Sequence, residues 1–301
     1  MSPTLGAARS DDPIVAAVGP PLPMGKRIPL RGRGTTFVRE VPGPPGAPTV
    51  LLLHGWIASG GLNWFTVFDA LGADYRVLAP DHRGHGRGIR SRNRFTLADC
   101  ADDAAVMLEQ LRTGPVIAVG YSLGGPVAQL LWRRHPDLVD GLVLCATSHH
   151  LVAGFREQML FGTVMAAAAG SSRLGSLAAR VPVRQLRQWL PAGTTSRPDS
   201  MRQWASAEMR RHDARHLLEA GWAMSNYHAR WIGDIDVPTA VVVTTKDRAV
   251  NPLAQVSMAL RIPNASIHRV EDGHVACSRP PFGPALAAAV GDVAGRAYPR
   301  P

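Results

Sequence analysis

The sequence predicts an α/β protein with a mostly parallel central sheet and helices on both of its faces. Short, continuously apolar runs alternate with segments of helical periodicity, which is typical of parallel strands buried on both sides. One apolar run, residues 116–119, enters a glycine-rich turn and continues directly into a helix. A long stretch without a convincing strand then interrupts the alternation and indicates a helical insertion. With 301 residues, the chain is long enough to bury a full core around such a sheet.

The individual elements follow from the same periodicity. Before the insertion, the predicted strands are 26–30, 35–41, 49–53, 76–80, 116–119 and 141–146, with helices at 97–111 and after the glycine-rich turn. Inside the insertion, Ser200 follows Pro198-Asp199 and predicts a helix start. The alternation then resumes with a strand at 239–244, a helix near 252–260, a strand at 266–270 and a helix at 281–294.

The chain therefore divides into three parts. Residues 1–25 are rich in Pro, Gly and Ala without periodicity, and we expect a flexible N-terminal segment. Residues 26–148 and 233–301 are predicted to form the α/β core. Residues 149–232 are predicted to form a helical cap inserted into that core.

Composition excludes several classes of protein. The formal charge is +10, but the basic residues are almost all arginines, are scattered, and match no nucleic-acid-binding motif, so no nucleic-acid partner is predicted. No apolar run is long enough for a transmembrane segment, and the N-terminus lacks a signal-peptide pattern. The three cysteines are odd in number and form no C-x-x-C pair, which argues against a disulfide framework or a zinc site. These features predict a soluble, cytoplasmic protein.

The glycine-rich turn, Gly120-Tyr121-Ser122-Leu123-Gly124, has the form G-x-S-x-G. Between a strand and a helix, this pattern typically forms a nucleophile elbow, in which a strained turn lifts the serine hydroxyl clear of the sheet. The following helix directs its N-terminal N–H groups toward the place where an oxyanion would form. The turn predicts Ser122 as a catalytic nucleophile. The alternative is a chance glycine-rich turn with a surface serine.

A serine hydroxyl needs a base to take its proton and an acid to orient that base. His274 and Asp247 each follow a predicted strand, so both belong to the carboxyl edge of the sheet, where open α/β sheets place their sites. Their order along the chain, after Ser122, is the one expected with an elbow. Asp272 is the competing acid, but it follows the strand that already supplies the histidine.

A tetrahedral oxyanion requires hydrogen-bond donors. The main-chain N–H of Leu123 is the first predicted donor, because it follows the nucleophile. The second is the N–H of Trp56, in the loop after strand 49–53. The side chains of Trp56 and Tyr121 are predicted to bind substrate. His54, in the same loop, is a candidate base, but a structural role in holding the loop is the preferred interpretation.

The segment Asp81-His82-Arg83-Gly84-His85-Gly86 is dense in acids and histidines. Its spacing matches no metal-ligand pattern. Its glycines predict a tight turn in which Asp81 and Arg83 hydrogen-bond to the main chain. We therefore predict no metal and no cofactor.

Taken in order, these motifs resemble the α/β-hydrolase superfamily, in particular its cap-bearing bacterial serine hydrolases. The matching pieces are His54-Gly55-Trp56, Asp81-x-Arg83-Gly84-x-Gly86, residues 120–125, Asp247 and Gly273-His274. They cover about residues 36–148 and 233–297. Gly88 departs from the serine that the family often has after the Gly86 turn, and the cap has no match that we can name.

The resemblance implies a serine hydrolase that cleaves a carboxylic ester of an apolar acyl group through an acyl-enzyme intermediate. It leaves open an acyltransferase or thioesterase with the same triad, and a cofactor-free haloperoxidase-like enzyme or a C–C bond hydrolase. Related epoxide hydrolases and dehalogenases carry aspartate at the elbow, so Ser122 argues against both. A non-catalytic binding protein of this family would normally lack a triad residue. The expected partner is a small-molecule ester or acyl substrate, and the oligomeric state is not predicted.

The cap is predicted to lie over the carboxyl edge of the sheet, because it leaves after strand 141–146 and returns before Asp247. Several of its large apolar side chains are expected to line an apolar cavity. These side chains are Phe155, Met159, Leu160, Phe161, Met165, Trp189, Trp204, Met209, Trp222, Met224, Tyr227 and Trp231. Its solvated outer face is expected to carry Arg202, Arg210, Arg211 and Arg215.

Overall fold

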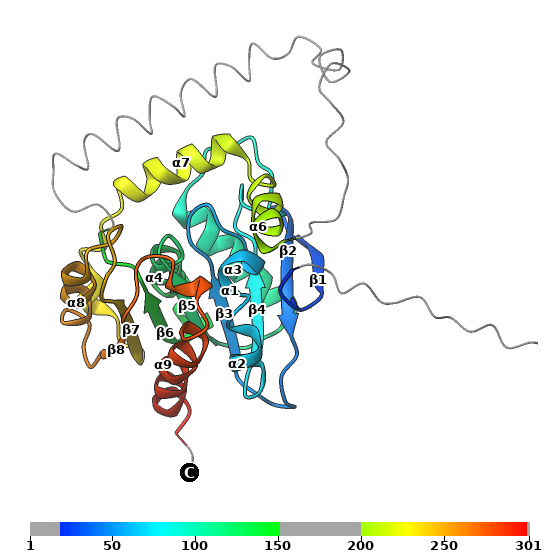
Figure 1. Ribbon diagram of the computed structural model, residues 1–301. Helices are drawn as coiled ribbons and strands as arrows, with labels where there is room; N and C mark the ends of the chain where they lie inside the picture. The colour runs from blue at the N-terminus through cyan, green and yellow to red at the C-terminus, as the bar shows by residue number, and fades with distance from the viewer. Residues whose placement is uncertain (1–18, 151–199, 300–301) are drawn as a thin grey trace, which may run out of the picture.

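A computed structural model describes residues 19–150 and 200–299 of the chain (Figure 1). In this part, eight strands form one sheet in the order β1-β2-β4-β3-β5-β6-β7-β8. The strands are β1 (Gly25–Leu30), β2 (Gly34–Val41), β3 (Thr49–Leu53), β4 (Arg76–Pro80), β5 (Val116–Tyr121), β6 (Val139–Cys145), β7 (Thr239–Thr244) and β8 (Ser266–Val270). The β1–β2 and β2–β4 pairs are antiparallel, and the other pairs are parallel. The predicted mostly parallel sheet is confirmed.

Helices cover both faces of the sheet, as predicted. The helices of the core are α1 (Gly60–Trp64), α2 (Phe68–Gly72), α3 (Leu97–Leu111), α4 (Gly124–Arg134), α8 (Pro252–Ala259) and α9 (Phe282–Ala297), with short 3-10 turns η1 (Pro136–Leu138), η3 (Ile232–Asp234) and η4 (Ala276–Ser278). Leu51 and Leu53 of β3 pack in an apolar cluster with residues of α3, α4 and α8. Val50 and Leu52 pack on the opposite face with residues of α1, α2 and α9. Strand β3 is therefore buried on both sides, which explains its continuously apolar sequence.

Only part of the predicted cap can be compared with the structure. Residues 151–199 lie outside the described residues, as do residues 1–18 of the predicted N-terminal segment. The rest of the cap contains α6 (Met201–Met209) and α7 (Ala214–Ser225). Ser200 caps α6, because its side chain accepts a hydrogen bond from the Gln203 N–H at 3.3 Å. The boundaries of the cap remain a prediction.

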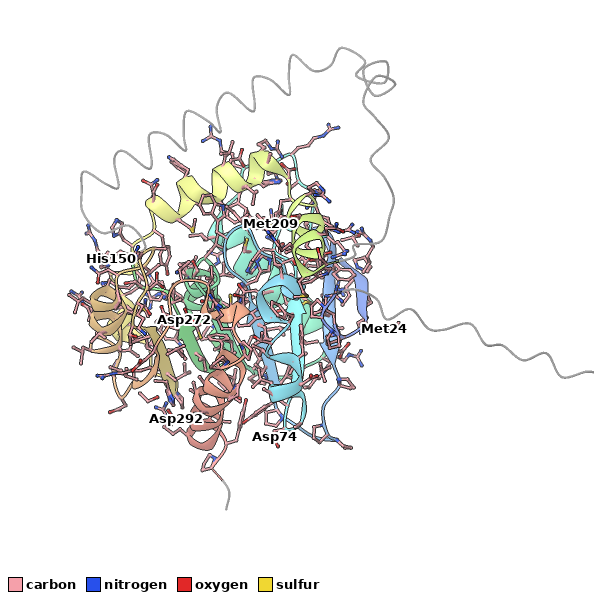
Figure 2. The ribbon with its side chains drawn as sticks, in the orientation of Figure 1. Met24, Asp74, His150, Met209, Asp272 and Asp292 are labelled. Carbon is pink, nitrogen blue, oxygen red and sulfur yellow. The ribbon has the colours of Figure 1, made fainter. Side chains whose placement is uncertain are left out.

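The described apolar side chains of the cap occupy both exposed and buried positions. Met209 and Trp222 are exposed, and Figure 2 shows Met209 on α6. Met224 and Tyr227 are instead buried in the apolar cluster of the core. The first six of the twelve apolar residues, Phe155, Met159, Leu160, Phe161, Met165 and Trp189, lie outside the described residues.

The arginines of the cap are mostly exposed, but one has a specific place. Arg215 donates to the main-chain carbonyls of Ser91 and Arg92 and so does not belong to a purely solvated face.

Among the helices of residues 19–150 and 200–299, we find none with the length and apolarity needed to cross a bilayer.

Candidate active site

The turn between β5 and α4 holds Ser122 in a strained backbone. Its φ angle is +52°, in the left-handed region that a non-glycine residue adopts at an energetic cost. Its N–H donates to the Cys145 carbonyl at 3.0 Å. A Cβ at Gly120 would meet the Gly124 carbonyl oxygen at 2.3 Å, and one at Gly124 would meet the Leu53 carbonyl oxygen at 2.0 Å. Both positions of the G-x-S-x-G pattern therefore require glycine, as the predicted elbow does.

The three residues predicted to act together come together at the carboxyl edge of the sheet. Nε2 of His274 lies 3.0 Å from Oγ of Ser122, and Nδ1 of His274 lies 2.8 Å from Oδ2 of Asp247. Ser122 follows β5, Asp247 follows β7 and His274 follows β8. The sheet brings the ends of these three strands to one edge. If the serine hydroxyl donates to Nε2, the ring proton is on Nδ1 and faces the carboxylate. This arrangement permits proton transfer from the hydroxyl to the imidazole.

Asp247 is held by its own loop in an ionised state. Oδ1 accepts from the N–H groups of Ala249 and Val250, and Oδ2 accepts from the Thr244 hydroxyl at 2.7 Å. Burial opposes ionisation, but the hydrogen bonds from His274, Val250 and Thr244 outweigh it and lower the pKa of Asp247. The carboxylate is therefore available to fix the imidazole and to stabilise an imidazolium.

The competing acid, Asp272, has different partners. Its carboxylate accepts from the Gly273 N–H at 2.7 Å and lies 3.9 Å from Nε of Arg279. Figure 2 labels it on the loop after β8. The geometry thus favours Asp247 as the partner of His274, in agreement with the preference drawn from strand order.

The loop after β3 lies beside the serine. A Cβ at Gly55 would be 3.4 Å from the Ser122 Cβ, which places the main chain of Gly55 against the elbow. The Gly55 N–H donates to Asn63 Oδ1 at 2.9 Å and so fixes this approach. Sequence reasoning did not identify Asn63, because nothing in its local pattern distinguishes it. Leu123 comes directly after Ser122, and Trp56 comes directly after Gly55, so the two residues lie on adjoining loops. Their N–H groups remain the predicted oxyanion donors.

His54 supports this loop. Its Nε2 accepts from the His82 N–H at 2.9 Å, and its Nδ1 lies 2.8 Å from the Gly55 carbonyl oxygen. The ring is fully buried, and burial together with the neighbouring His82 imidazole lowers its pKa well below the ordinary value. Both ring nitrogens are thus engaged by main-chain groups, as the structural interpretation of His54 requires.

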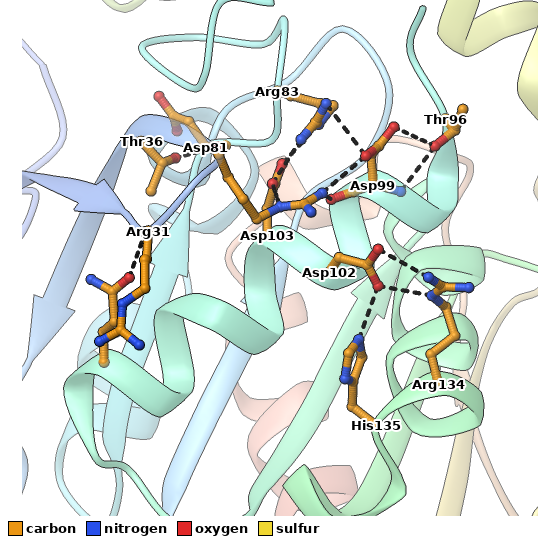
Figure 3. A network of polar contacts seen from close by, with 12 residues as sticks. Arg31, Thr36, Asp81, Arg83, Thr96, Asp99, Asp102, Asp103, Arg134 and His135 are labelled. Carbon is orange, nitrogen blue, oxygen red and sulfur yellow. Dashed lines mark hydrogen bonds and ion pairs between the residues drawn. The ribbon is translucent and has the colours of Figure 1, made fainter. Parts of the chain in front are cut away.

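The Asp81–Gly86 turn agrees with the prediction at Asp81 and differs at Arg83. The Asp81 carboxylate accepts from the main-chain N–H groups of Gly60 and Arg87. Among the described residues, the partner of the Arg83 side chain is a carboxylate and not the main chain: it forms two hydrogen bonds to Asp103, at 2.7 and 2.8 Å (Figure 3). Because its guanidinium is almost completely buried, it needs a carboxylate partner there. Within the described ranges, no group of three or more His, Cys, Asp or Glu residues is arranged to hold a metal ion.

The expected contact of Tyr121 with substrate does not fit its position. The side chain is 2% exposed and packs between Trp64 and Phe282, with ring centroids 6.0 and 5.6 Å away. Its hydroxyl donates to the main-chain carbonyl of His274 at 2.8 Å. Because both faces of β5 are buried, Tyr121 points into the core and supports the histidine loop from within.

Comparison with known proteins agrees with this fold. Residues 48–279 match the profile of the family described as the alpha/beta hydrolase fold, and the chain belongs to that family. It is similar to the magnesium-chelatase 30 kDa subunit of Rhodobacter capsulatus, with 28% identity over 239 residues that cover 77% of this chain and 82% of the relative. It is also similar to the pimeloyl-[acyl-carrier protein] methyl ester esterase of Vibrio atlanticus, with 31% identity over 172 residues, 51% of this chain and 64% of the relative.

Solved structures have the same fold. The esterase from Exiguobacterium antarcticum superimposes with a TM-score of 0.71 and 19% identity, covering 89% of this chain and all (100%) of that one. A bromoperoxidase from Bacillus anthracis gives a TM-score of 0.69 and 21% identity, with the same coverage of 89% and 100%. At this level of identity the likeness establishes the fold alone.

Proposed function

We propose that this protein is a serine hydrolase that cleaves a carboxylic ester of an apolar acyl group through an acyl-enzyme intermediate. Ser122 is the nucleophile, His274 the general base and Asp247 the acid that orients it. The observation that carries the proposal is the continuous hydrogen-bonded line from the Ser122 hydroxyl through the His274 ring to the Asp247 carboxylate, with distances of 3.0 and 2.8 Å.

The reaction has two stages. In the first, Oγ of Ser122 attacks the ester carbonyl carbon while Nε2 of His274 takes the hydroxyl proton, and Asp247 stabilises the resulting imidazolium. The N–H groups of Leu123 and Trp56 donate to the oxyanion of the tetrahedral intermediate. Its collapse breaks the carbon–oxygen bond, and the leaving alcohol takes the proton from Nε2.

In the second stage, water attacks the acyl-serine and gives a proton to Nε2. The second tetrahedral intermediate releases the carboxylic acid, and the proton returns to Oγ of Ser122. An acyltransferase would use the same first stage and replace water by another acceptor.

An apolar ester is supported by the side chains that flank the reacting groups. Ile57, in the loop that follows Gly55, is 36% exposed, and Val275, directly after His274, is 60% exposed. Apolar side chains so exposed beside a site favour an apolar acyl group over a charged one. The curated relative named as a methyl ester esterase and the solved esterase agree with ester cleavage.

A fluorophosphonate probe tests the nucleophile. Mass spectrometry should find the probe on Ser122, and Ser122→Ala should abolish labelling and turnover of an activated ester. Ser266→Ala is the matched control: Ser266 also lies near a histidine and an aspartate, but its hydroxyl and Nε2 of His268 both face Asp292. Labelling that persists in Ser122→Ala would reject the proposal.

A substrate panel then separates ester cleavage from the alternatives. It should contain an ester and a thioester with the same acyl group, and a vinylogous substrate whose cleavage would break a C–C bond. Separate assays should test for peroxide-dependent halogenation and for transfer of the acyl group to an added alcohol. The proposal expects the ester to have the highest kcat/KM, with the free acid as product. A higher value for the thioester, or transfer of the acyl group to the alcohol, would identify a thioesterase or an acyltransferase instead.

A further inference from the structure

The loop that carries the proposed oxyanion donor is held differently on its two sides. Before Trp56, Gly55 is fixed by its hydrogen bond to Asn63, and His54 is fixed by the His82 N–H. After Trp56, Ile57 has a φ angle of +56°, a conformation that a β-branched residue rarely adopts. A neighbouring structure must maintain this strained turn, and the direction of the Trp56 N–H depends on it.

The side chain of Trp56 reaches a neighbour that meets this need. Its Nε1–H donates to the main-chain carbonyl of Leu217 at 2.9 Å. Leu217 belongs to α7 of the predicted cap, whereas Trp56 belongs to the core. The indole ring is half-buried and packs against the apolar cluster of the core. Because an indole has a single N–H donor, this hydrogen bond fixes the orientation of the ring relative to α7.

Helix α7 is in turn fastened to the loops that follow β4. The N–H of Asp213, which caps α7, donates to the Gly84 carbonyl at 2.8 Å. The Phe95 N–H donates to Oε2 of Glu219 in α7 at 2.8 Å. These contacts place α7 over the carboxyl edge of the sheet, and in Figure 1 the helix lies across that end of the molecule. A displacement of α7 would therefore act on Trp56.

We propose that Trp56 is a positioning residue, through which the position of α7 determines the direction of the oxyanion donor. This inference rests on the function proposed above. With α7 in its observed place, the indole hydrogen bond holds the strained turn and keeps the Trp56 N–H in the direction that an oxyanion requires. When α7 moves away, the hydrogen bond breaks, the turn at Ile57 relaxes and the donor turns aside. The hydrolase is then competent only while this part of the cap is docked.

Trp56→Phe tests the coupling, because it keeps an aromatic ring and removes the indole donor. The variant should lower kcat by about 10- to 100-fold, the scale of a misdirected catalytic group, and leave KM nearly unchanged. Trp132→Phe is the matched control. Trp132 is buried near the C-terminal end of α4, at the opposite end of that helix from the elbow, and its Nε1–H donates to Asp236 at 3.2 Å. Both variants lose one indole hydrogen bond, but only Trp56→Phe should lose activity.

The affinity for phenylboronic acid is a second readout. It reports on the oxyanion site directly, so a loss of packing alone should not weaken it in parallel with kcat. The boron forms a tetrahedral adduct with a catalytic serine, and one oxygen of the adduct occupies the oxyanion site. Trp56→Phe should weaken this inhibition by the same factor as kcat, whereas Trp132→Phe should not. A Trp56→Phe enzyme with the kcat and the boronate affinity of the control would overturn the coupling. Wild-type protein that the fluorophosphonate does not label would overturn the proposed function, and this inference with it.

The wild-type protein provides a second test that does not depend on the folding of a variant. By NMR, the indole N–H of Trp56 should exchange with solvent more slowly when the boronic acid is bound than in the free protein, because the occupied oxyanion site favours the docked arrangement. The indole N–H of Trp132 should exchange at the same rate in both states. Equal rates for Trp56 in the two states would reject the coupling.

Discussion

The hydroxyl of Tyr121 donates a 2.8 Å hydrogen bond to the main-chain carbonyl of His274, so that the residue before the proposed nucleophile supports the proposed base. Burial strongly raises the pKa of Tyr121, so its hydroxyl remains protonated and able to donate. The ring is fixed by Trp64 and Phe282 in the core. The position of His274 is therefore set by the apolar face of the sheet as well as by Asp247.

Tyr121→Phe should lower kcat with little change in KM, because the His274 loop loses one of its supports. We expect a loss of about tenfold, below the roughly 100-fold effect of a full 1 Å displacement. Tyr227→Phe is the control: its hydroxyl, also buried, donates to Gln129 Oε1 at 2.8 Å away from the triad. Each variant should lose about 0.5–1.5 kcal/mol of unfolding free energy in urea titrations. Equal kcat values for the two variants would show that the Tyr121 hydroxyl does not position the base.

Asp247→Asn should reduce kcat by up to about 10⁴-fold, because an amide does not hold the His274 tautomer or stabilise the imidazolium. The fold should survive, since the remaining oxygen still accepts from Ala249 and Val250. Asp272→Asn should have a far smaller effect, because Asp272 contacts Gly273 and Arg279. Steady-state kinetics on folded variants with the opposite ranking would transfer the acid role to Asp272.

Stability should depend on pH through a buried cluster of histidines. The rings of His54, His82 and His85 lie together, with centroids 4.2 and 5.4 Å from His54, and His212 of the predicted cap lies 5.6 Å from His85. Burial lowers the pKa of all four, and that of His82 to about 3. The imidazoles nearest to the first three lower their pKa further. These shifts favour the neutral form of the four imidazoles in the folded protein.

The sign of the effect follows from proton binding. In the unfolded chain, histidines titrate near ~6.5, so below that pH the unfolded state binds protons that the folded state does not. The free energy of unfolding should thus fall as the pH decreases from about 6.5, by up to ~1.4 kcal/mol per pH unit for each such histidine. Urea titrations at several pH values measure the slope. His85→Phe should reduce this slope, because it removes one of the buried histidines. A slope that His85→Phe leaves unchanged would contradict the assignment.

The pair of Arg83 and Asp103 should be a principal contribution to stability. Arg83 is 5% exposed, and it joins the loop after β4 to α3 through two hydrogen bonds (Figure 3). Asp103→Ala would leave a buried guanidinium with less compensation, and we expect a loss of about 3–5 kcal/mol in unfolding free energy. Asp102→Ala is the control on the same helix, because its partners Arg134 and His135 are 44% and 29% exposed, against 5% for Arg83, and exposed pairs contribute about 0–1 kcal/mol. Similar losses from the two substitutions would show that burial does not determine the strength of the pair.

The strands and the proposed triad could be predicted from sequence because their signals are local or follow from strand order. Residues 116–119 and 240–243 are continuously apolar because both faces of these strands are buried, and the glycine requirements around Ser122 are steric. His274 and Asp247 could be chosen because parallel strands end at one edge. Gly88, which departs from the family pattern, is also steric: a Cβ there would meet the His82 carbonyl oxygen at 2.1 Å.

Partners that are distant in sequence could not be predicted. Nothing near Arg83 identifies Asp103, on the following helix, as its partner, and nothing near Trp56 identifies Leu217, which is 161 residues away. The direction of Tyr121 was not predictable for another reason. A strand buried on both faces has no alternation of polar and apolar residues that would distinguish the face on which a side chain lies.

The length of the acyl group should determine kcat/KM if the apolar side chains beside the site bind it. Each methylene that leaves water contributes up to ~0.8 kcal/mol, so kcat/KM should rise by up to about fourfold per methylene from acetate upward. The rise should end where further methylenes remain in solvent. Val275→Asn should flatten the series, because it replaces an exposed apolar side chain next to His274. Leu260→Asn, at a still more exposed apolar position that caps the end of α8, should leave it unchanged. If kcat/KM of the wild-type enzyme stays constant or falls as the acyl group is lengthened from acetate, an apolar acyl substrate is rejected, even if the acetate ester is cleaved well.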